Sequence, residues 1–267
     1  MSERVFTWYG PVNRGRRRPT PRWSWLPWVL AGLTVLLQIT YPLTSGDTRT
    51  GLTVVTVVMF FLASASHALL WRGVSWTLGY LGITLIGGWA VEAFGSSHDV
   101  LFGAYDYTNT LGAKIGGVPL IIPLAWAMMA YPALIVAQRL VRSRIALPFV
   151  AGLALASWDL FLDPMMVADG HWVWQTTTPA LPGVPGIPLH NFIGWFVVAV
   201  IMTGLLSLLP RIEVDDNQPI TLWLWTYVSS VLANAVFLDR PSVALVGGIA
   251  MGVIALPLAV SLWRDRP

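Results

Sequence analysis

Two aspartates in the string WDLFLDP are the clearest candidates for chemistry in this sequence. Asp159 and Asp163 are four residues apart, so on a helix their carboxyl groups lie on one face, about one turn apart. In a low-dielectric setting two such groups disfavour joint ionisation, and one of them is expected to hold a proton at neutral pH. A protonated carboxyl beside an ionised one is suited to general acid catalysis.

The same residues allow other interpretations. Asp163 precedes Pro164 and can end a helix by turn chemistry, whereas Asp159 lies one turn deeper and has no such explanation. The two aspartates could also bind a divalent cation, with Glu92 and His190 as further ligands. Glu92 is the third acidic candidate for catalysis, and it could instead form a structural ion pair.

Aromatic side chains occur close to these acids along the chain. The strings FGAYDYTNTLG and DGHWVWQ alternate aromatic and polar residues, which is typical of extended segments with two different faces. Aromatic rings often serve core packing, but beside carboxyl groups they can also stabilise a carbocation, by about 2 kcal/mol or more per desolvated contact. The candidates for this role are Tyr105, Tyr107, Trp126, Trp158, Trp172, Trp174 and Trp195. The candidates for orienting water are His190, Asn191 and Asp106.

The other histidines have simpler expected roles. His67 lies inside an apolar segment, where a hydrogen bond to a neighbouring helix is more common than ligand binding. His98 and His171 lie in connecting segments and are expected to be solvated.

The composition points to a bilayer environment. The chain has 267 residues, of which 55% are hydrophobic and 11% charged, whereas about 25% are charged in soluble proteins. Cysteine is absent, which excludes disulfides and thiolate sites. The net charge of +3 comes from basic residues beside apolar segments, so membrane topology explains it better than nucleic acid, which is not expected as a partner.

Eight segments are apolar for about the 20 residues that a membrane-crossing helix needs. The predicted fold is therefore an all-α integral membrane bundle with two long outer loops rich in aromatic, Gly and Pro residues. The eight segments are Trp25–Leu43, Gly51–Trp71, Ser75–Phe94, Pro119–Gln138, Ile145–Leu162, Asn191–Leu209, Ile220–Leu238 and Ser242–Trp263.

Basic residues predict the orientation. If the N-terminus is cytoplasmic and all eight segments cross, 13 Lys and Arg residues lie on the cytoplasmic side and 3 on the other. The positive-inside rule favours this arrangement. We therefore expect a multi-pass protein of the cell membrane, with a basic cytoplasmic tail at 1–24, one transmembrane domain at 25–263 and a cytoplasmic tail at 264–267.

The two long connections, Gly95–Val118 and Asp163–His190, resemble each other. The string GVPLIIPL in the first is echoed by GVPGIPLH in the second at an offset of 66 residues. This similarity indicates a weak parallel repeat of helix, aromatic loop and helix. Residues that match at an offset of 67 are Glu92 with Asp159, Tyr105 with Trp172, and Tyr107 with Trp174.

Several of these motifs together resemble a known family. Residues 75–210 are similar to the membrane carotenoid biosynthesis protein family that contains the γ-carotene 1′,2′-hydratase and bisanhydrobacterioruberin hydratase, the CruF-like proteins. The motifs that carry the resemblance are Glu92, FGAYDYTNTLG, GVPLIIPLAW, WDLFLDP, DGHWVW and PGVPGIPLHNFIGW.

The resemblance implies an enzyme, a carotenoid 1,2-hydratase. Such an enzyme adds water, without a cofactor or metal, to the terminal C=C bond of an acyclic carotenoid end group and forms a tertiary alcohol. The implied substrate is a carotenoid such as γ-carotene, lycopene or bisanhydrobacterioruberin, in contact with membrane lipids. Other enzymes of the carotenoid pathway are candidate partners. In this scheme Asp159 donates the proton, and Glu92 or Asp163 orients or deprotonates water.

Two other functions remain open. An intramembrane polyprenyltransferase would use DLFLD as a magnesium–diphosphate motif, although a second Asp-rich motif is missing from the sequence. A transporter or a non-catalytic scaffold would explain the repeat but not the grouping of acids.

Overall fold

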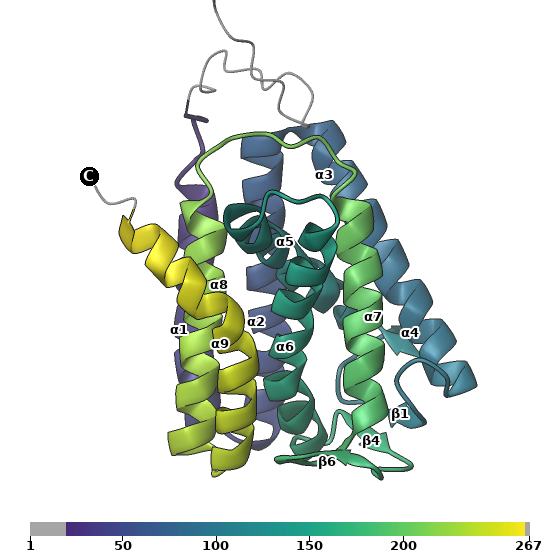
Figure 1. The fold of residues 1–267 in the computed structure, drawn as a ribbon. Coiled ribbons are helices and arrows are strands. Elements are labelled where there is room, and N and C mark those ends of the chain that lie inside the picture. The colour runs from purple at the N-terminus through teal and green to yellow at the C-terminus, as the bar shows by residue number, and fades with distance from the viewer. Residues whose placement is uncertain (1–19, 265–267) are drawn as a thin grey trace, which may run out of the picture.

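The eight apolar segments are helices in the computed structural model of the chain, which describes residues 20–264. Within those residues, eight helical spans are long and apolar enough to cross a membrane, which confirms the predicted fold class (Figure 1). The spans are α1–η1 (Leu26–Thr40, Tyr41–Leu43), α2–η2 (Gly46–His67, Ala68–Arg72), α3–η3–α4 (Val74–Leu81, Gly82–Ile86, Gly87–His98), α5 (Ile121–Leu140), α6 (Ala146–Ala168), α7 (Leu189–Leu206), α8–η4 (Asn217–Leu232, Ala233–Phe237) and α9 (Pro241–Arg264).

Helices α5 and α6 form the centre of the bundle. They are its most enclosed spans, and α6 packs against α5, α7 and α9 (Figure 1). Small residues allow this close packing, as expected for helices in a membrane. At Gly152 of α6, for example, an added Cβ would lie 2.6 Å from Cγ2 of Val200 on α7. The central helices therefore hold their side chains at nearly fixed positions.

Short strands gather at one end of the bundle, on both long loops. Strand β1 (Tyr105–Tyr107) pairs antiparallel with β4 (Trp172–Trp174), which joins the first loop to the second. Each loop also carries its own small hairpin. These hairpins are β2–β3 (Lys114–Ile115, Val118–Pro119) and β5–β6 (Ala180–Leu181, Val184–Pro188).

The two halves of the site region share one order of elements. Helix α4 is followed by β1, the β2–β3 hairpin and α5, and helix α6 is followed by β4, the β5–β6 hairpin and α7. This order agrees with the repeat expected from the sequence. We refer below to β1, β4 and their flanking loop residues 99–113 and 169–179 as the aromatic lid.

Helix α6 ends later than the sequence suggested. Its predicted end was Leu162, with Asp163 and Pro164 in an exit turn, but the helix continues through both residues to Ala168. Proline removes one backbone donor, yet backbone groups at membrane depth are best satisfied within a helix. The helix ends where Gly170, at φ 73°, reverses the chain. Turn chemistry therefore does not explain Asp163.

The two ends of the described chain lie at the bundle end opposite the strands (Figure 1). The chain order of the spans also places seven of the ten described basic residues at that end, and only Arg49, Lys114 and Arg240 at the strand end. Of the predicted tails, residues 1–19 and 265–267 lie outside the described residues.

A buried cluster of polar side chains connects three helices at the end of the bundle opposite the strands. Nδ1 of His67 lies 2.8 Å from the Tyr131 hydroxyl, which confirms its expected hydrogen bond to another helix. Arg72 donates to the same hydroxyl at 2.9 Å and to Asp216 at 2.5 Å. These bonds tie α2, α5 and the start of α8 together.

Candidate functional site

Glu92 of α4 accepts three hydrogen bonds from aromatic side chains. Its Oε2 atom accepts from the hydroxyls of Tyr105 at 2.6 Å and Tyr107 at 2.7 Å. Its Oε1 atom accepts from Nε1 of Trp126, on α5, at 2.9 Å. The residue is 3% exposed, so these donors replace the water that a carboxyl group needs when it is buried.

Asp163 of α6 has an equivalent set of donors from the second loop. Its Oδ1 atom accepts from the indole nitrogens of Trp172 at 2.6 Å and Trp174 at 3.3 Å. Its Oδ2 atom accepts from Nδ2 of Asn191, near the start of α7, at 2.6 Å. In the repeat, the structural counterpart of Glu92 is therefore Asp163, although the sequence offset had matched Glu92 with Asp159.

Asp159 lies one turn away on the same helix and differs from Asp163 in its partners. The Nδ2 atom of Asn191 donates to Oδ2 of Asp159 at 2.9 Å, so a single amide bridges the two aspartates. The Oδ1 atom of Asp159 is buried and has no hydrogen-bond partner among the described residues. Glu92, Asp159 and Asp163 have six carboxyl oxygens. Among the described residues, five of these oxygens accept a hydrogen bond and only Oδ1 of Asp159 does not.

Three tryptophans form a cluster beside the acids, and two of them are stacked. The rings of Trp126 and Trp195 are nearly parallel, with centroids 4.0 Å apart. Trp158 meets Trp195 edge to face at 6.3 Å. Because Trp126 also donates to Glu92, the stack and the carboxyl groups belong to one site.

The aromatic lid supplies the remaining rings. Tyr105 contacts Trp174 at 5.0 Å and Tyr107 contacts Trp172 at 5.8 Å between ring centroids. Burial and the neighbouring Glu92 carboxyl raise the pKa of Tyr105. Both tyrosines therefore remain hydrogen-bond donors to Glu92 at physiological pH.

A close contact locks the lid against α7. At Gly194, an added Cβ would clash with the backbone carbonyl oxygen of Leu101, in the first loop. Phe102, the next residue, is 2% exposed and contacts both Trp195 and Tyr105. Only glycine at position 194 permits this approach of loop and helix.

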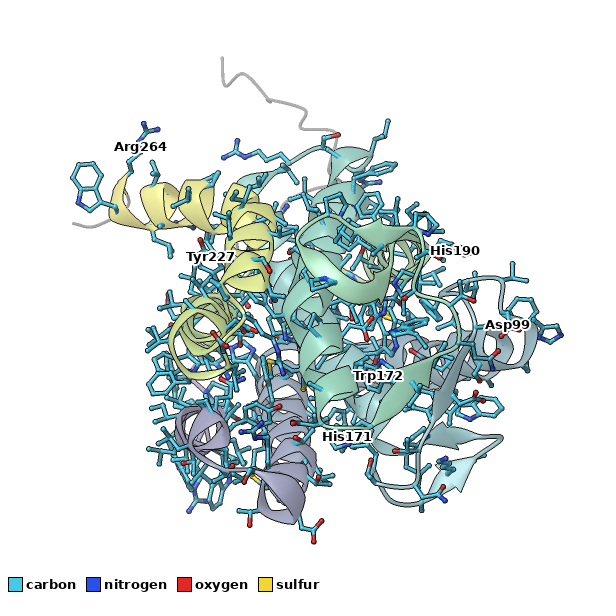
Figure 2. The ribbon with its side chains drawn as sticks, turned by 90° about the horizontal axis from the view of Figure 1, so that it is seen from below. Asp99, His171, Trp172, His190, Tyr227 and Arg264 are labelled. Atoms are coloured by element: carbon cyan, nitrogen blue, oxygen red, sulfur yellow. The ribbon has the colours of Figure 1, made fainter. Side chains whose placement is uncertain are left out.

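The structure brings together most of the residues selected from the sequence. The three acids, the seven aromatic residues and Asn191 form one site at the strand end of the bundle. Two selected residues lie elsewhere. His190 is exposed and lies at the rim, apart from the buried Trp172 (Figure 2). Asp106 is also exposed and accepts a hydrogen bond from Gln175. His190 belongs to the first turn of α7 and Asp106 to β1, and neither side chain is hydrogen-bonded to the acids.

His171 is a lid residue that sequence reasoning missed. It was expected to be solvated, but its side chain is fully buried. Its Nδ1 atom lies 2.8 Å from the Thr110 hydroxyl, in the other half of the lid. Its position directly before WVW was the only signal in the sequence, and loop histidines are too often exposed for that signal to be specific.

The geometry of the site bears on the alternative that the acids bind a metal ion. Among residues 20–264, no three His, Asp or Glu side chains lie together in a way that could hold a metal ion. His190, one of the ligands considered, is exposed, whereas the three acids are buried.

Fold and site together define a class of protein: a multi-pass helical membrane protein with a buried carboxyl site beneath an aromatic lid. Residues 52–261 match the family model described as "Carotenoid biosynthesis protein". The chain therefore belongs to this family and has a role in carotenoid biosynthesis. The match is longer than the 75–210 span of the motif resemblance. It includes most of α2, all of α8–η4 and most of α9, whereas α1 lies outside it. No curated protein and no solved structure matches the chain significantly.

Proposed function

We propose that this protein hydrates the terminal C=C bond of an acyclic carotenoid end group, with Asp159 as the proton donor. The observation that carries the proposal is the difference between two carboxyl groups bridged by one amide. Asp163 accepts three N–H donors, whereas Asp159 accepts one and keeps Oδ1 uncommitted. Asp159 is therefore the better placed of the two to hold a proton and release it to a substrate.

The reaction needs no group beyond acids, rings and water. Asp159 transfers its proton to the less substituted carbon of the double bond, and the π electrons form the new C–H bond. The positive charge then lies on the tertiary carbon. Water attacks that carbon to form a C–O bond, and the oxonium proton passes to a carboxylate of the site. Return of a proton to Asp159 completes the cycle, so the net change is addition of one water.

The aromatic residues support the cationic step. A tertiary cation in a dry site needs electron-rich faces nearby, and indole faces are the strongest of these among side chains. The Trp126–Trp195 stack and Trp158 supply such faces beside the acids. The lid separates this site from the bulk solvent at the strand end, which limits side reactions of the cation.

The alternative prenyl transfer reaction makes different demands. It needs carboxylates free to hold magnesium, and a cation for the diphosphate. Here Asp163 is fully engaged by the lid and Asn191. Lys114, the basic residue of the first loop, donates to the Tyr107 carbonyl oxygen. These contacts favour hydration.

Expression in a host that accumulates lycopene or γ-carotene tests the proposal. We expect a product heavier by one water, and no such product from the matched Asp159→Asn variant. Activity in isolated membranes should persist in EDTA. Loss of activity with EDTA and recovery with magnesium would favour prenyl transfer instead, whereas absence of any new product would favour a transporter or scaffold.

A further inference from the structure

A second cavity is lined by a different stripe of α6 from the one that carries Asp159 and Asp163. It has a volume of about 100 Å³, is lined by residues of α1, η1, α2, α5, α6 and α8–η4, and is open on part of its surface. We refer to it as the α6–α8 cavity. Its lining residues on the two facing helices are Trp158, Phe161, Leu162, Met165 and Met166 of α6, and Thr226, Ser229, Ser230 and Ala233 of α8–η4.

The sequence explains why this space exists. The residues of α8–η4 that line it recur at spacings of three and four, so they form one stripe along the helix. Every member of that stripe is small, while the facing stripe of α6 is large and apolar. Three of the small residues are hydroxyl-bearing, which gives an otherwise apolar space a polar edge.

Two further polar groups on the wall have no partner. The Oε1 atom of Gln38 on α1 and the hydroxyl of Thr56 on α2 are buried, and neither has a hydrogen bond within the described chain. By contrast, the Thr53 and Thr226 hydroxyls donate to carbonyls of their own helices. Uncommitted polar atoms are costly in an apolar interior, so a pair of them facing one cavity indicates a polar ligand group.

A hydrogen bond and a salt bridge hold one lining residue of this cavity, Tyr41, in place at the strand end. The hydroxyl of Tyr41, a lining residue, donates to Asp169 at 2.5 Å. Arg49 pairs with the same carboxylate at 3.1 Å and lies over the Tyr41 ring. These contacts fix the position of the Tyr41 side chain in the cavity wall.

We propose that the α6–α8 cavity binds a small branched group that carries one hydroxyl, specifically the dimethylcarbinol end formed when a terminal isoprene unit is hydrated. Methyl groups fit against Met128, Phe161 and Met165, while the alcohol donates to Gln38 and accepts from Thr56. A cavity of roughly 150 Å³ accommodates benzene in another protein. About 100 Å³ is smaller and holds the carbinol group alone, so the attached chain leaves through the open side of the cavity.

Trp158 connects this cavity to the acids. It lines the cavity and also contacts Trp195 of the site. The identity of the ligand as the reaction product rests on the proposed function, whereas the cavity's preference for a tertiary alcohol rests on its own lining. A pocket that binds the hydrated end would keep the tertiary alcohol away from the acids, and so oppose the reverse dehydration.

The test uses the full chain in lipid nanodiscs, with ¹³C-methyl methionine as the reporter. Met128, Met165 and Met166 line the cavity, whereas Met202 and Met251 are buried elsewhere. We expect 2-methylbutan-2-ol to shift the three cavity signals and not the other two. Its isostere 2,2-dimethylbutane, compared at equal lipid-phase concentration, should bind about tenfold more weakly because it cannot form the hydrogen bonds.

Variants separate the polar recognition from the shape of the cavity. The double variant Gln38→Leu with Thr56→Val should abolish the preference for the alcohol. The matched control is Thr34→Val, because Thr34 is buried on α1, bonds to Leu30 and does not line the cavity. Ala233→Leu should fill the space and abolish binding of both probes.

Two results would overturn the proposal: no shift of the cavity methionines at saturating alcohol, or equal binding of the alcohol and the hydrocarbon by the unmodified protein. Neither result depends on turnover. If hydration products form in the host but the alcohol does not bind, the cavity proposal alone fails. If the alcohol binds but no hydration product forms, the cavity keeps its ligand class and the proposed reaction fails.

Discussion

Tyr105 and Trp174 face each other across the β1–β4 pair, and each reaches a different buried carboxylate. Their rings are 5.0 Å apart between centroids. The Tyr105 hydroxyl donates to Glu92, while the Trp174 indole donates to Asp163. The aromatic lid therefore couples two acids that come from different halves of the repeat. We therefore expect a substitution of one acid to alter the hydrogen bonds of the other through this strand pair.

Asp159→Asn should lower turnover by about 10²–10⁴-fold, the usual contribution of a general acid. An asparagine oxygen can still accept the Asn191 hydrogen bond, so the protein should fold, but the transferable proton is lost. The measurement is product formed per folded protein in membranes, with folding checked by size-exclusion chromatography. Turnover close to that of the unmodified protein would remove Asp159 from the mechanism.

Asp163→Asn should affect stability as well as turnover. The substitution turns one acceptor oxygen into an N–H donor, which then faces indole or amide donors of the lid. An unsatisfied buried polar group costs about 1–3 kcal/mol. Hydrogen exchange in β4 should become faster in this variant than in Asp159→Asn. Equal exchange in the two variants would contradict the assigned difference between the two aspartates.

Gly194→Ala should destabilise the protein by about 1–3 kcal/mol, the usual cost of overpacking. The new methyl group would clash with the Leu101 carbonyl and push the lid away from α7. Gly204→Ala on the same helix is the control, because its nearest neighbour would be Pro148 at 3.7 Å. Thermal unfolding in detergent should separate the two variants. Equal melting temperatures would mean that the lid does not need this contact.

Acidification should loosen the lid through His171. Burial lowers the pKa of His171 below its ordinary 6.5, although the charge of nearby Asp169 acts in the opposite direction. The unfolded chain therefore takes up a proton at a higher pH than the folded one, and stability is present above about 6.5 and falls as the pH drops below it. Exchange in β1 and β4, corrected for its intrinsic pH dependence, should rise between pH 7.5 and 5.5. The rise should be smaller in His171→Asn, and an equal rise in both proteins would exclude His171 as the cause.

The orientation in the membrane is testable by fusion. The basic residues of the described chain concentrate at the end opposite the strands, and this end should be cytoplasmic by the positive-inside rule. A reporter that is active only in the cytoplasm, fused after Pro267, should be active. A reporter inserted between Asn109 and Thr110, in the first loop, should be inactive, and the reverse pattern would invert the topology.

Hydropathy was sufficient to predict the spans, because a bilayer imposes length and polarity on every helix that crosses it. The acids, the rings and the repeat were also visible in the sequence, since charged and aromatic residues stand out in an apolar chain. The end of α6 was not predictable from the Asp163–Pro164 pair. Local turn preference favoured a helix exit there, and the need to satisfy backbone groups at membrane depth outweighed it.

Only the tertiary structure determined which side chains form hydrogen bonds with each other. Whether Asp159 or Asp163 corresponds to Glu92 depends on which carboxyl the lid reaches, and that follows from how β4 packs against α6. The exposure of His190 follows in the same way from the packing of α7, and the burial of His171 follows from the path of the second loop. A sequence records which residues can donate or accept a hydrogen bond. Only packing between segments distant in the chain determines which donor meets which acceptor, because that choice depends on geometry that no local pattern encodes.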